Sequence, residues 1–361
     1  MSLTTQTMTN RHKRTRVLCP LVDSPYEVLG MILSYVADTS MVDLAACSLT
    51  CRKVRSVSVP ILFRDIYCTW PLLPKLIPTL DQNSITSHIR GLHIIKSSSW
   101  GEWHCDSELV PVLKACPRII ELDLVLSGSS GWMKYVSPDL CASIETLVVR
   151  SQVSINYKDN KANTSVPFPQ FDFGDIHKFA KVKTLTIQGF QISDTSELEE
   201  ESLSSDSHSV LEALESVHLV NSIWSYPFDF TDIDSLRHLS ISYSPSYLSY
   251  TYLERLKSLA QGPPVNLTSL ELNLPDNACK PWHALSHISN ASSLRQVELR
   301  GFELPSADYF NSLPDSINQF KVYTPYNDKR QPTDLVELAG RLKAQCKYTI
   351  SLEDNCMVLY K

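Results

Sequence analysis

The chain has 361 residues, of which 43% are hydrophobic, and a formal net charge of -6 at pH 7. This acidic balance excludes a general binder of nucleic acid or of anionic membranes, because such proteins carry a basic surface. The length exceeds that of most single domains, so the sequence predicts one small domain and one long one.

The ten cysteines show neither a C-x-x-C pair nor a regular spacing, which is typical of reduced thiols in an intracellular protein. No secretory signal is visible, and no apolar run approaches the thickness of a bilayer. We therefore expect a soluble protein of the cytoplasm, the nucleus or both, without a membrane partner. Residues 1–19 are predicted to be a basic, disordered tail. Its run from Arg11 to Arg16 belongs either to a solvated tail or to a nuclear-import signal.

Residues 20–66 contain three short helical patterns, and the first begins near residue 24. We expect Ser24 to be its N-cap, Pro25 to take the first helical position, and residues 38–40 to end it. Its apolar residues fall on one stripe of a helix: Val28, Leu29, Ile32, Leu33 and Val36.

The second helix is predicted to follow Ser40 and to carry Leu44, and the third to begin near Cys51 and to stop before Pro60. Helices this short are unstable alone, so we expect them to share one small core. They carry more apolar surface than that core can cover, and an uncovered apolar surface usually marks a partner. The surplus includes Tyr26, Ile32 and Leu49.

Several of these residues form a pattern that resembles the F-box family. The matching positions are Pro25, Glu27, Val28, Leu29, Ile32, Leu33, Tyr35, Asp43, Leu44, Cys47, Cys51 and Arg52. Residues 60–64 match the Pro-x-Leu-Phe-Arg ending of fungal F-boxes. Ser24 and Val54 depart from the pattern, which usually has leucine and tryptophan there. An ordinary helical hairpin that caps the longer domain is the alternative.

The resemblance implies that residues 20–66 dock on the Skp adaptor of an SCF-type cullin–RING ubiquitin ligase. It also implies that the rest of the chain holds a protein substrate near the ubiquitin-conjugating enzyme, without catalysing a reaction and without a cofactor. The two departures are expected to weaken the adaptor contact without removing it. Carried over position by position, the adaptor-binding residues are Pro25, Tyr26, Val28, Ile32, Leu44, Leu49, Cys51 and Val54.

The remainder of the chain repeats one motif: an aliphatic residue, two others, an aliphatic, one other, and an aliphatic. The middle residues of its copies lie 22 to 38 positions apart, whereas a leucine-rich-repeat coil needs about 20 to 29 residues. These middle residues are Ile66, Leu92, Leu122, Leu147, Leu185, Val217, Leu239, Leu270, Val297 and Phe320. Helical patterns lie between copies at Leu109–Leu113, Leu211–Leu214, Leu253–Leu259 and Leu335–Leu342.

The sequence thus predicts an α/β fold in which a short three-helix domain precedes an irregular leucine-rich-repeat solenoid over residues 67–361, with parallel strands on its concave face. The asparagine or cysteine that regular repeats place after the strand is missing, which leaves the repeat count open by one or two. An open α/β sheet is the competing fold. It requires fewer, longer strands and a glycine-rich phosphate loop, and the chain has only ten glycines.

Residues 155–172 and 193–209 interrupt the repeats and are predicted to be disordered insertions. The first segment has no periodicity. The second combines serines with acidic residues, so it is either a solvated loop or a site of phosphorylation.

The chain contains no G-x-S-x-G elbow, P-loop, G-x-G-x-x-G or H-E-x-x-H motif. His283 and His287 lie four residues apart on a predicted helix, but a third metal ligand is missing nearby. His104 and Cys105 are adjacent, so their side chains point apart. The sequence therefore predicts neither an enzyme nor a metal site.

Residues between the strand aliphatics are expected to point to the concave face. Their mixture is neither basic enough for phosphates nor apolar enough for lipid, so it fits a protein epitope and no nucleic acid. The candidate substrate-binding residues are Glu121, Asp123, Arg150, His218, His238, Glu271, Glu298, Arg300 and Tyr323. One alternative is a ligase-independent scaffold. The other is an enzyme whose site would join His218, His238 and Glu271, although their places on separate coils argue against it.

Overall fold

The computed structural model describes residues 20–82, 85–95, 105–126, 133, 136–151, 169–193, 211–224, 230, 233–242, 263–273, 292–300, 309–310, 313–323, 333–345, 348–353 and 356–361. The chain divides into two compact units after Arg64, two residues before the predicted boundary. The predicted basic tail lies outside the described residues, as do His104, His283 and His287. No helix in the described ranges combines the length and the apolar character needed to cross a bilayer.

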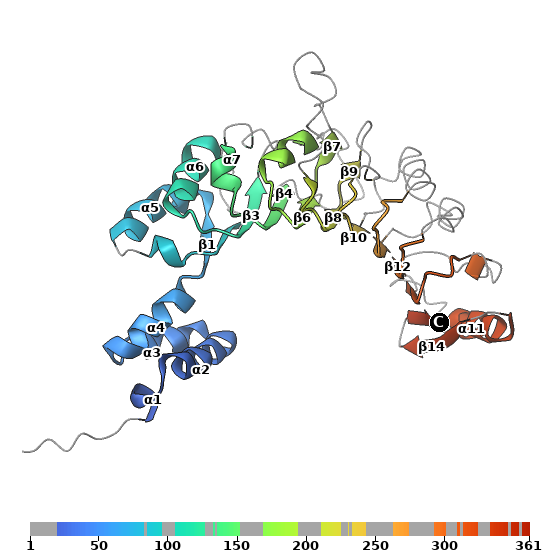
Figure 1. Ribbon diagram of the computed structural model, residues 1–361, viewed down its shortest axis with the longest axis horizontal. Coiled ribbons are helices and arrows are strands. Elements are labelled where there is room, and N and C mark those ends of the chain that lie inside the picture. The colour runs from blue at the N-terminus through green and yellow to red at the C-terminus, as the bar shows by residue number, and fades with distance from the viewer. Residues whose placement is uncertain are drawn as a thin grey trace, which may run out of the picture. The chain divides into compact units, whose positions relative to one another are not determined.

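The first unit is a small helical bundle (Figure 1). After the single turn α1 (Pro20–Asp23) come α2 (Tyr26–Thr39), α3 (Met41–Ser48) and α4 (Arg52–Leu62). Side chains cap the last two helices: the Ser40 hydroxyl accepts the backbone N–H of Asp43 at 3.2 Å, and the Cys51 sulfur accepts that of Val54 at 3.5 Å.

Two predicted helix limits are wrong. Pro25, and not Ser24, occupies the N-cap position of α2, because its extended backbone (ψ 152°) delays the first helical residue to Tyr26. Helix α4 also runs through Pro60 to Leu62. Pro60 has no N–H for the Ser56 carbonyl, but the helix continues because Leu62, with its neighbour Ile61, packs against the bundle core.

The core of the bundle consists of four side chains that are at most 1% exposed: Leu29, Leu33, Leu44 and Val54. Leu29 and Leu33 lie four residues apart and so share one side of α2. Fully burying an aliphatic side chain contributes about 1.5–3 kcal/mol, so these four residues, with the half-buried apolar side chains packed around them, hold the three short helices together.

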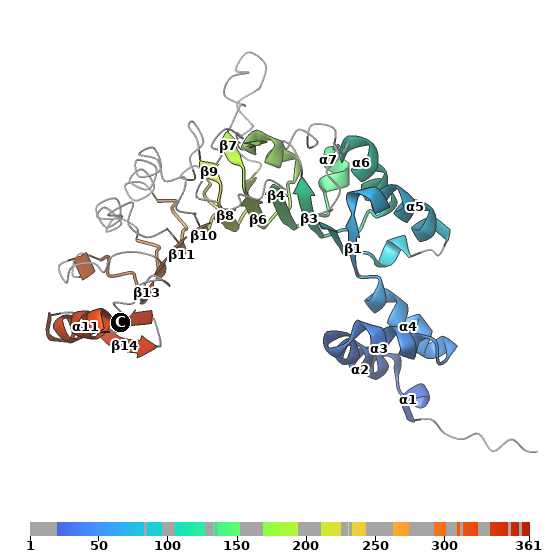
Figure 2. The ribbon, with the colours of Figure 1, turned by 180° about the vertical axis from the view of Figure 1, so that it is seen from behind.

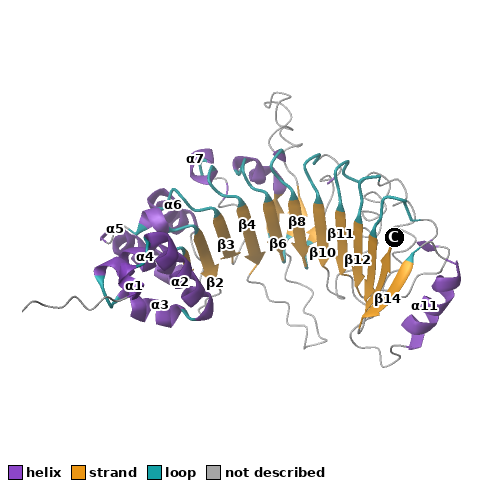
Figure 3. Cartoon of the chain, turned by 60° about the horizontal axis from the view of Figure 1, so that its bottom comes forward, coloured by secondary structure: helices purple, strands orange, loops and turns teal. Residues whose placement is uncertain are grey.

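The second unit is built on a sheet whose first ten strands are parallel and follow the chain order (Figure 3). These strands are β1 (Asp65–Thr69), β2 (Gly91–Ile95), β3 (Glu121–Leu126), β4 (Thr146–Ser151), β6 (Thr184–Gln188), β8 (Ser216–Val220), β10 (His238–Ser242), β11 (Ser269–Asn273), β12 (Gln296–Arg300) and β13 (Gln319–Tyr323). Each contains one predicted motif copy, and the ten middle residues are in register. The predicted solenoid architecture is confirmed.

Helices and turns lie on the convex side of this sheet (Figures 1 and 2). They include η1 (Trp70–Leu72), α5 (Leu73–Gln82), η2 (Thr86–His88), α6 (Cys105–Ala115), α7 (Pro138–Cys141), η4 (Phe173–Lys178) and α11 (Thr333–Gln345). The helices predicted at 109–113 and 335–342 are confirmed as parts of α6 and α11. The one predicted at 211–214 is a turn, and residues 253–259 lie outside the described ranges.

A second, smaller sheet was not predicted. Its parallel strands are β5 (Gln170–Asp172), β7 (Gln191–Ser193) and β9 (Ile223–Trp224). The insertion predicted at 155–172 therefore ends in a strand, and the one predicted at 193–209 begins within β7. The rest of both insertions lies outside the described residues.

At its C-terminal end the main sheet changes from parallel to antiparallel pairing. Strand β15 (Cys356–Tyr360) pairs antiparallel with β13, and β14 (Thr349–Glu353) pairs antiparallel with β15. This hairpin covers the open edge of the last parallel strand, which would otherwise present unpaired backbone groups.

Backbone hydrogen bonds join each coil to the next where the strands begin. The Ile120 carbonyl, for example, accepts the N–H groups of Glu145 at 2.8 Å and Thr146 at 2.9 Å. The same double acceptance recurs at the carbonyls of Arg90, Glu145, Lys183, Glu215, Arg237, Thr268 and Arg295. This backbone ladder satisfies main-chain groups without side chains, so the coils stay joined although the asparagine of regular repeats is missing.

Candidate functional site

The bundle exposes an apolar stripe along α2. Val28, Met31, Ile32 and Tyr35 are spaced three and four residues apart, so they share one side of the helix, and all four are exposed. The core leucines of α2 lie on a different side. Further exposed apolar side chains of the bundle are Tyr26, Met41, Val42 and Leu49. We call these eight residues the apolar surface of the bundle.

Lys53 of α4 fixes the start of α2 beside this surface. Its ammonium donates a hydrogen bond to the Ser24 carbonyl at 2.6 Å. The same ammonium lies 5.0 Å from the centre of the Tyr26 ring, within range of a cation–π interaction. Tyr26 is thus oriented although more than half of its surface is exposed.

The strand face of the second unit is the side of the sheet away from the helices. Along most of the parallel strands buried aliphatic residues alternate with half-buried ones, as β3 and β4 show most clearly. One outward-facing residue per strand is in register with its neighbours across the sheet; most of these residues are half-buried, whereas His93 and Ser240 are buried and Tyr67 is exposed. This central row is Tyr67, His93, Asp123, Val148, Thr186, His218, Ser240, Glu271, Glu298 and Lys321.

A first polar cluster spans β1 to β4. The rings of Tyr67 and His93 stack with centroids 4.4 Å apart. His93 Nδ1 lies 3.7 Å from Asp123 Oδ2, and Arg150 pairs with that same oxygen at 3.0 Å. Asp123 Oδ1 is buried without a hydrogen-bond partner, so Arg150 supplies the main compensation for this carboxylate.

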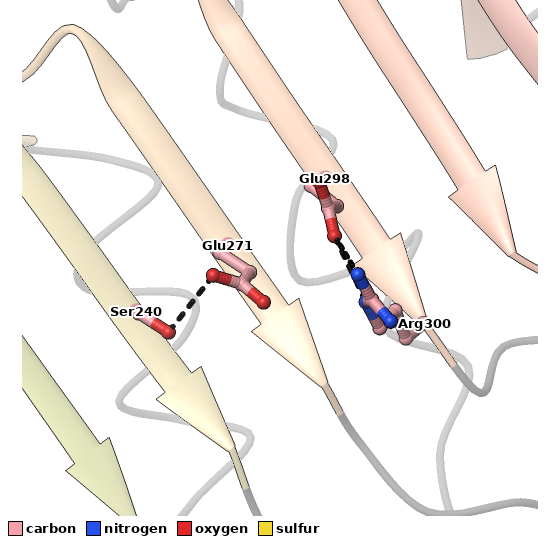
Figure 4. Close-up of polar contacts among 4 residues, drawn as sticks. All are labelled: Ser240, Glu271, Glu298 and Arg300. Atoms are coloured by element: carbon pink, nitrogen blue, oxygen red, sulfur yellow. Dashed lines mark hydrogen bonds and ion pairs between the residues drawn. The ribbon is translucent and has the colours of Figure 1, made fainter. Parts of the chain in front are cut away.

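A second cluster joins β8, β10 and β11. His218 Nε2 and Ser216 Oγ are 3.0 Å apart, and the rings of His218 and His238 lie 5.0 Å apart. Burial and the neighbouring His238 lower the pKa of His218, while Glu271 acts to raise it. Glu271 Oε2 accepts a hydrogen bond from the Ser240 hydroxyl at 3.2 Å (Figure 4).

A third cluster lies on β12 and β13. Arg300 donates from Nε at 2.8 Å and from Nη2 at 2.6 Å to Glu298 Oε1. Its guanidinium also lies 4.1 Å from the centre of the Tyr323 ring. Desolvation opposes the charged form, but the hydrogen bond and the charge of Glu298 prevail and raise the pKa of Arg300. Arg300 is therefore held in place and its charge is largely compensated.

Comparison with protein families gives a match at the N-terminal end of the chain. A family model described as F-box-like matches residues 25–69, which comprise α2, α3, α4 and β1. Residues 25–69 are an F-box-like domain. The F-box precedes a leucine-rich-repeat-like region, and the fold of that region is assigned from its strand order and register.

No curated protein matches the chain. Among solved structures, internalin C2 from Listeria monocytogenes str. 4b F2365 is 14% identical, with a TM-score of 0.39, over 73% of this chain and 96% of that one. Internalin F from the same strain is 11% identical, with a TM-score of 0.29, over 59% of this chain and 56% of that one.

The F-box exposes five of the eight predicted adaptor-binding side chains: Pro25, Tyr26, Val28, Ile32 and Leu49. Cys51 is half-buried, and its sulfur caps α4. Leu44 and Val54 are wrong as surface contacts, because both belong to the core. Sequence reasoning missed Met31, Tyr35, Met41 and Val42. The three- and four-residue spacing of Met31 and Tyr35 from Val28 and Ile32 was the available signal.

All nine predicted substrate-binding residues lie on the strand face. Four belong to the central row: Asp123, His218, Glu271 and Glu298. Glu121 and His238 lie two positions before that row, and Arg150, Arg300 and Tyr323 lie two positions after it. Their common face is confirmed, whereas their binding of a substrate stays a prediction.

The parallel register makes His218 and His238 neighbours, although they belong to separate coils, and their ring centroids lie 5.0 Å apart. The hydrogen bonds of His218 and Glu271, however, go to Ser216 and Ser240. In the described part of the chain, no three His, Cys, Asp or Glu side chains are placed to hold a metal ion.

Proposed function

We propose that the chain is the substrate-recognition subunit of an SCF-type cullin–RING ubiquitin ligase. The F-box docks on the Skp adaptor, and the strand face binds a protein substrate, in the cytoplasm, the nucleus or both. The chain itself catalyses no reaction and needs no cofactor. It raises the rate of ubiquitin transfer by holding the substrate close to the conjugating enzyme, so that an encounter becomes a tethered reaction.

One observation carries this proposal. Within a domain that matches the F-box-like model, α2 has two apolar sides, and only one of them packs into the core. The other side presents Met31, Ile32 and Tyr35 to solvent. Aromatic residues and methionine are enriched at the centres of protein interfaces, and exposed apolar groups of this size usually mark one.

The experiment is a pull-down of purified full-length chain with the Skp adaptor. Ile32→Asp places a charge in the middle of the exposed stripe and should cost about 2 kcal/mol or more of binding free energy, a loss of about 30-fold in affinity. Ser56→Asp is the matched control, because Ser56 is exposed on α4 and lies outside the apolar surface of the bundle. It should bind like the wild type.

Circular dichroism of both variants checks that the bundle remains folded. Failure of the wild-type chain to bind the adaptor would refute the proposal, and so would equal binding by Ile32→Asp.

A ligase-independent scaffold is the second candidate, and the surroundings of Ser24 favour it. Family members usually have leucine at this position, whereas serine offers no apolar side chain to the adaptor; its backbone carbonyl, which accepts a hydrogen bond from Lys53, would be present in leucine too. Val54, the other departure, is a core residue, so its effect falls on packing and not on the contact itself. Co-purification of a cullin with the chain supports the ligase subunit, and adaptor binding without a cullin supports the scaffold.

A further inference from the structure

The strand face carries more negative than positive charge. Along the ten parallel strands its carboxylates are Asp65, Glu121, Asp123, Glu271 and Glu298, and its lysine and arginine side chains are Arg150, Arg300 and Lys321. Both arginines are already engaged, Arg150 by Asp123 and Arg300 by Glu298. Among the described residues, no lysine or arginine forms an ion pair with Asp65, Glu121 or Glu271.

Of these three carboxylates, Glu271 is the one that a hydrogen bond from a described side chain holds in place. The Ser240 hydroxyl on the neighbouring strand holds one of its oxygens at 3.2 Å. Figure 4 shows the second oxygen turned away from Ser240, on the side of β12. A group that is already held loses less conformational entropy when a partner binds, so Glu271 is prepared to accept a further donor.

The position of Glu298 makes a cationic partner more favourable for Glu271. Glu271 and Glu298 stand directly opposite each other on β11 and β12, and like charges in this position destabilise a sheet. Arg300 compensates Glu298 through two hydrogen bonds to one oxygen. Arg300 also feels the charge of Glu271 at longer range, and Lys321 stands opposite Glu298 on β13. Glu271 nevertheless has no ion pair of its own among the described residues, and an acidic partner would add to the repulsion.

We propose that the strand face over β10, β11 and β12 binds a lysine- or arginine-bearing segment of the substrate protein, with Glu271 accepting a hydrogen bond from its cationic side chain. This inference rests on the proposed function only in treating the strand face as the substrate-binding surface. Serine and asparagine side chains on the same strands, at Ser242, Ser269 and Asn273, are available to the polar backbone of such a segment.

The test is a selection of phage-displayed random dodecapeptides on the immobilised full-length chain. The enriched peptides should contain more lysine and arginine than the unselected library. The affinity of one labelled, enriched peptide is then measured by fluorescence anisotropy. Glu271→Gln keeps the shape of the side chain and its bond to Ser240 but removes the charge, and should weaken binding about tenfold.

Two further variants sharpen the test. Glu337→Gln makes the same change on α11, where Glu337 pairs with Arg341 away from the strand face, and should leave the affinity unchanged. Arg300→Gln releases the charge of Glu298 beside Glu271 and should tighten binding of the basic peptide. Enrichment of acidic or neutral peptides, no enrichment, an unaffected Glu271→Gln variant, or equal or weaker binding by Arg300→Gln would each overturn the inference.

The same variants separate this inference from the proposed function. Glu271→Gln should still bind the Skp adaptor, because the substitution is in the second unit. If the wild type fails to bind the adaptor but selects basic peptides that depend on Glu271, the ligase role is refuted and the basic-segment site stands.

Discussion

Two leucines only five residues apart in the bundle should differ strongly in how much stability is lost when each is replaced by alanine. Leu44 has none of its surface exposed, whereas Leu49 is 77% exposed. Leu44→Ala removes a fully buried side chain and leaves a cavity among Leu29, Leu33 and Val54, which costs about 3 kcal/mol of stability. Leu49→Ala removes a side chain that is mostly in water and should change stability by less than about 0.5 kcal/mol.

Hydrogen exchange followed by mass spectrometry measures this difference within the full chain. A loss of 3 kcal/mol corresponds to exchange faster by about 100-fold for amides that exchange by opening of the bundle. Peptides from α2, α3 and α4 should therefore lose protection in Leu44→Ala and keep it in Leu49→Ala. In the adaptor pull-down, Leu49→Ala should bind less even though its fold is intact. If both variants lose protection equally, or Leu44→Ala loses none, the division between core and exposed surface is wrong.

Two more predictions concern the repeat region. Ser222 donates to the Ile187 carbonyl and accepts the N–H of Phe190, so Ser222→Ala should cost about 1–3 kcal/mol in urea unfolding by leaving buried groups unpaired, and an unchanged midpoint would contradict this. Because burial lowers the pKa of His218 below its ordinary value of 6.5, the unfolded chain binds more protons just below that pH, and stability should fall as the pH is lowered through this interval. The fall in urea midpoint between about pH 7.5 and 5.5 should be smaller in His218→Gln, whereas equal falls would refute the assignment.

The sequence predicted the strands well because each buries the same two aliphatic positions against its neighbours. Once Leu122 and Leu124 are assigned inward, the period of two places Asp123 outward, and the parallel register then aligns the central row. Periodicity did not predict the buried side of α2, because this helix carries apolar residues on two sides. Periodicity alone does not show which of Leu33 and Ile32 faces the core.

The small second sheet was also missed, because strands such as Ile223–Trp224 are too short to show any period. Another unrecognised signal is the serine directly before the first aliphatic residue of four motif copies, at Ser143, Ser235, Ser293 and Ser316. Three of these serines bond to the preceding coil. Ser143, Ser235 and Ser293 donate to the carbonyls of Ile119, Leu214 and Leu267 in the preceding coil. These bonds reinforce the backbone ladder, and their repetition becomes apparent only when the coils are aligned in space.

The backbone ladder accepts almost any amino acid at the junctions between coils, because it uses only main-chain groups. Its donors are main-chain N–H groups, such as those of Glu145 and Thr146, and its acceptors are carbonyls. Proline is the exception at the donor positions, because it has no N–H to give. Mutations at these junctions, and on the strand face beside them, can therefore accumulate without loss of the fold. A scaffold of this kind can change what it recognises during evolution while its architecture stays the same.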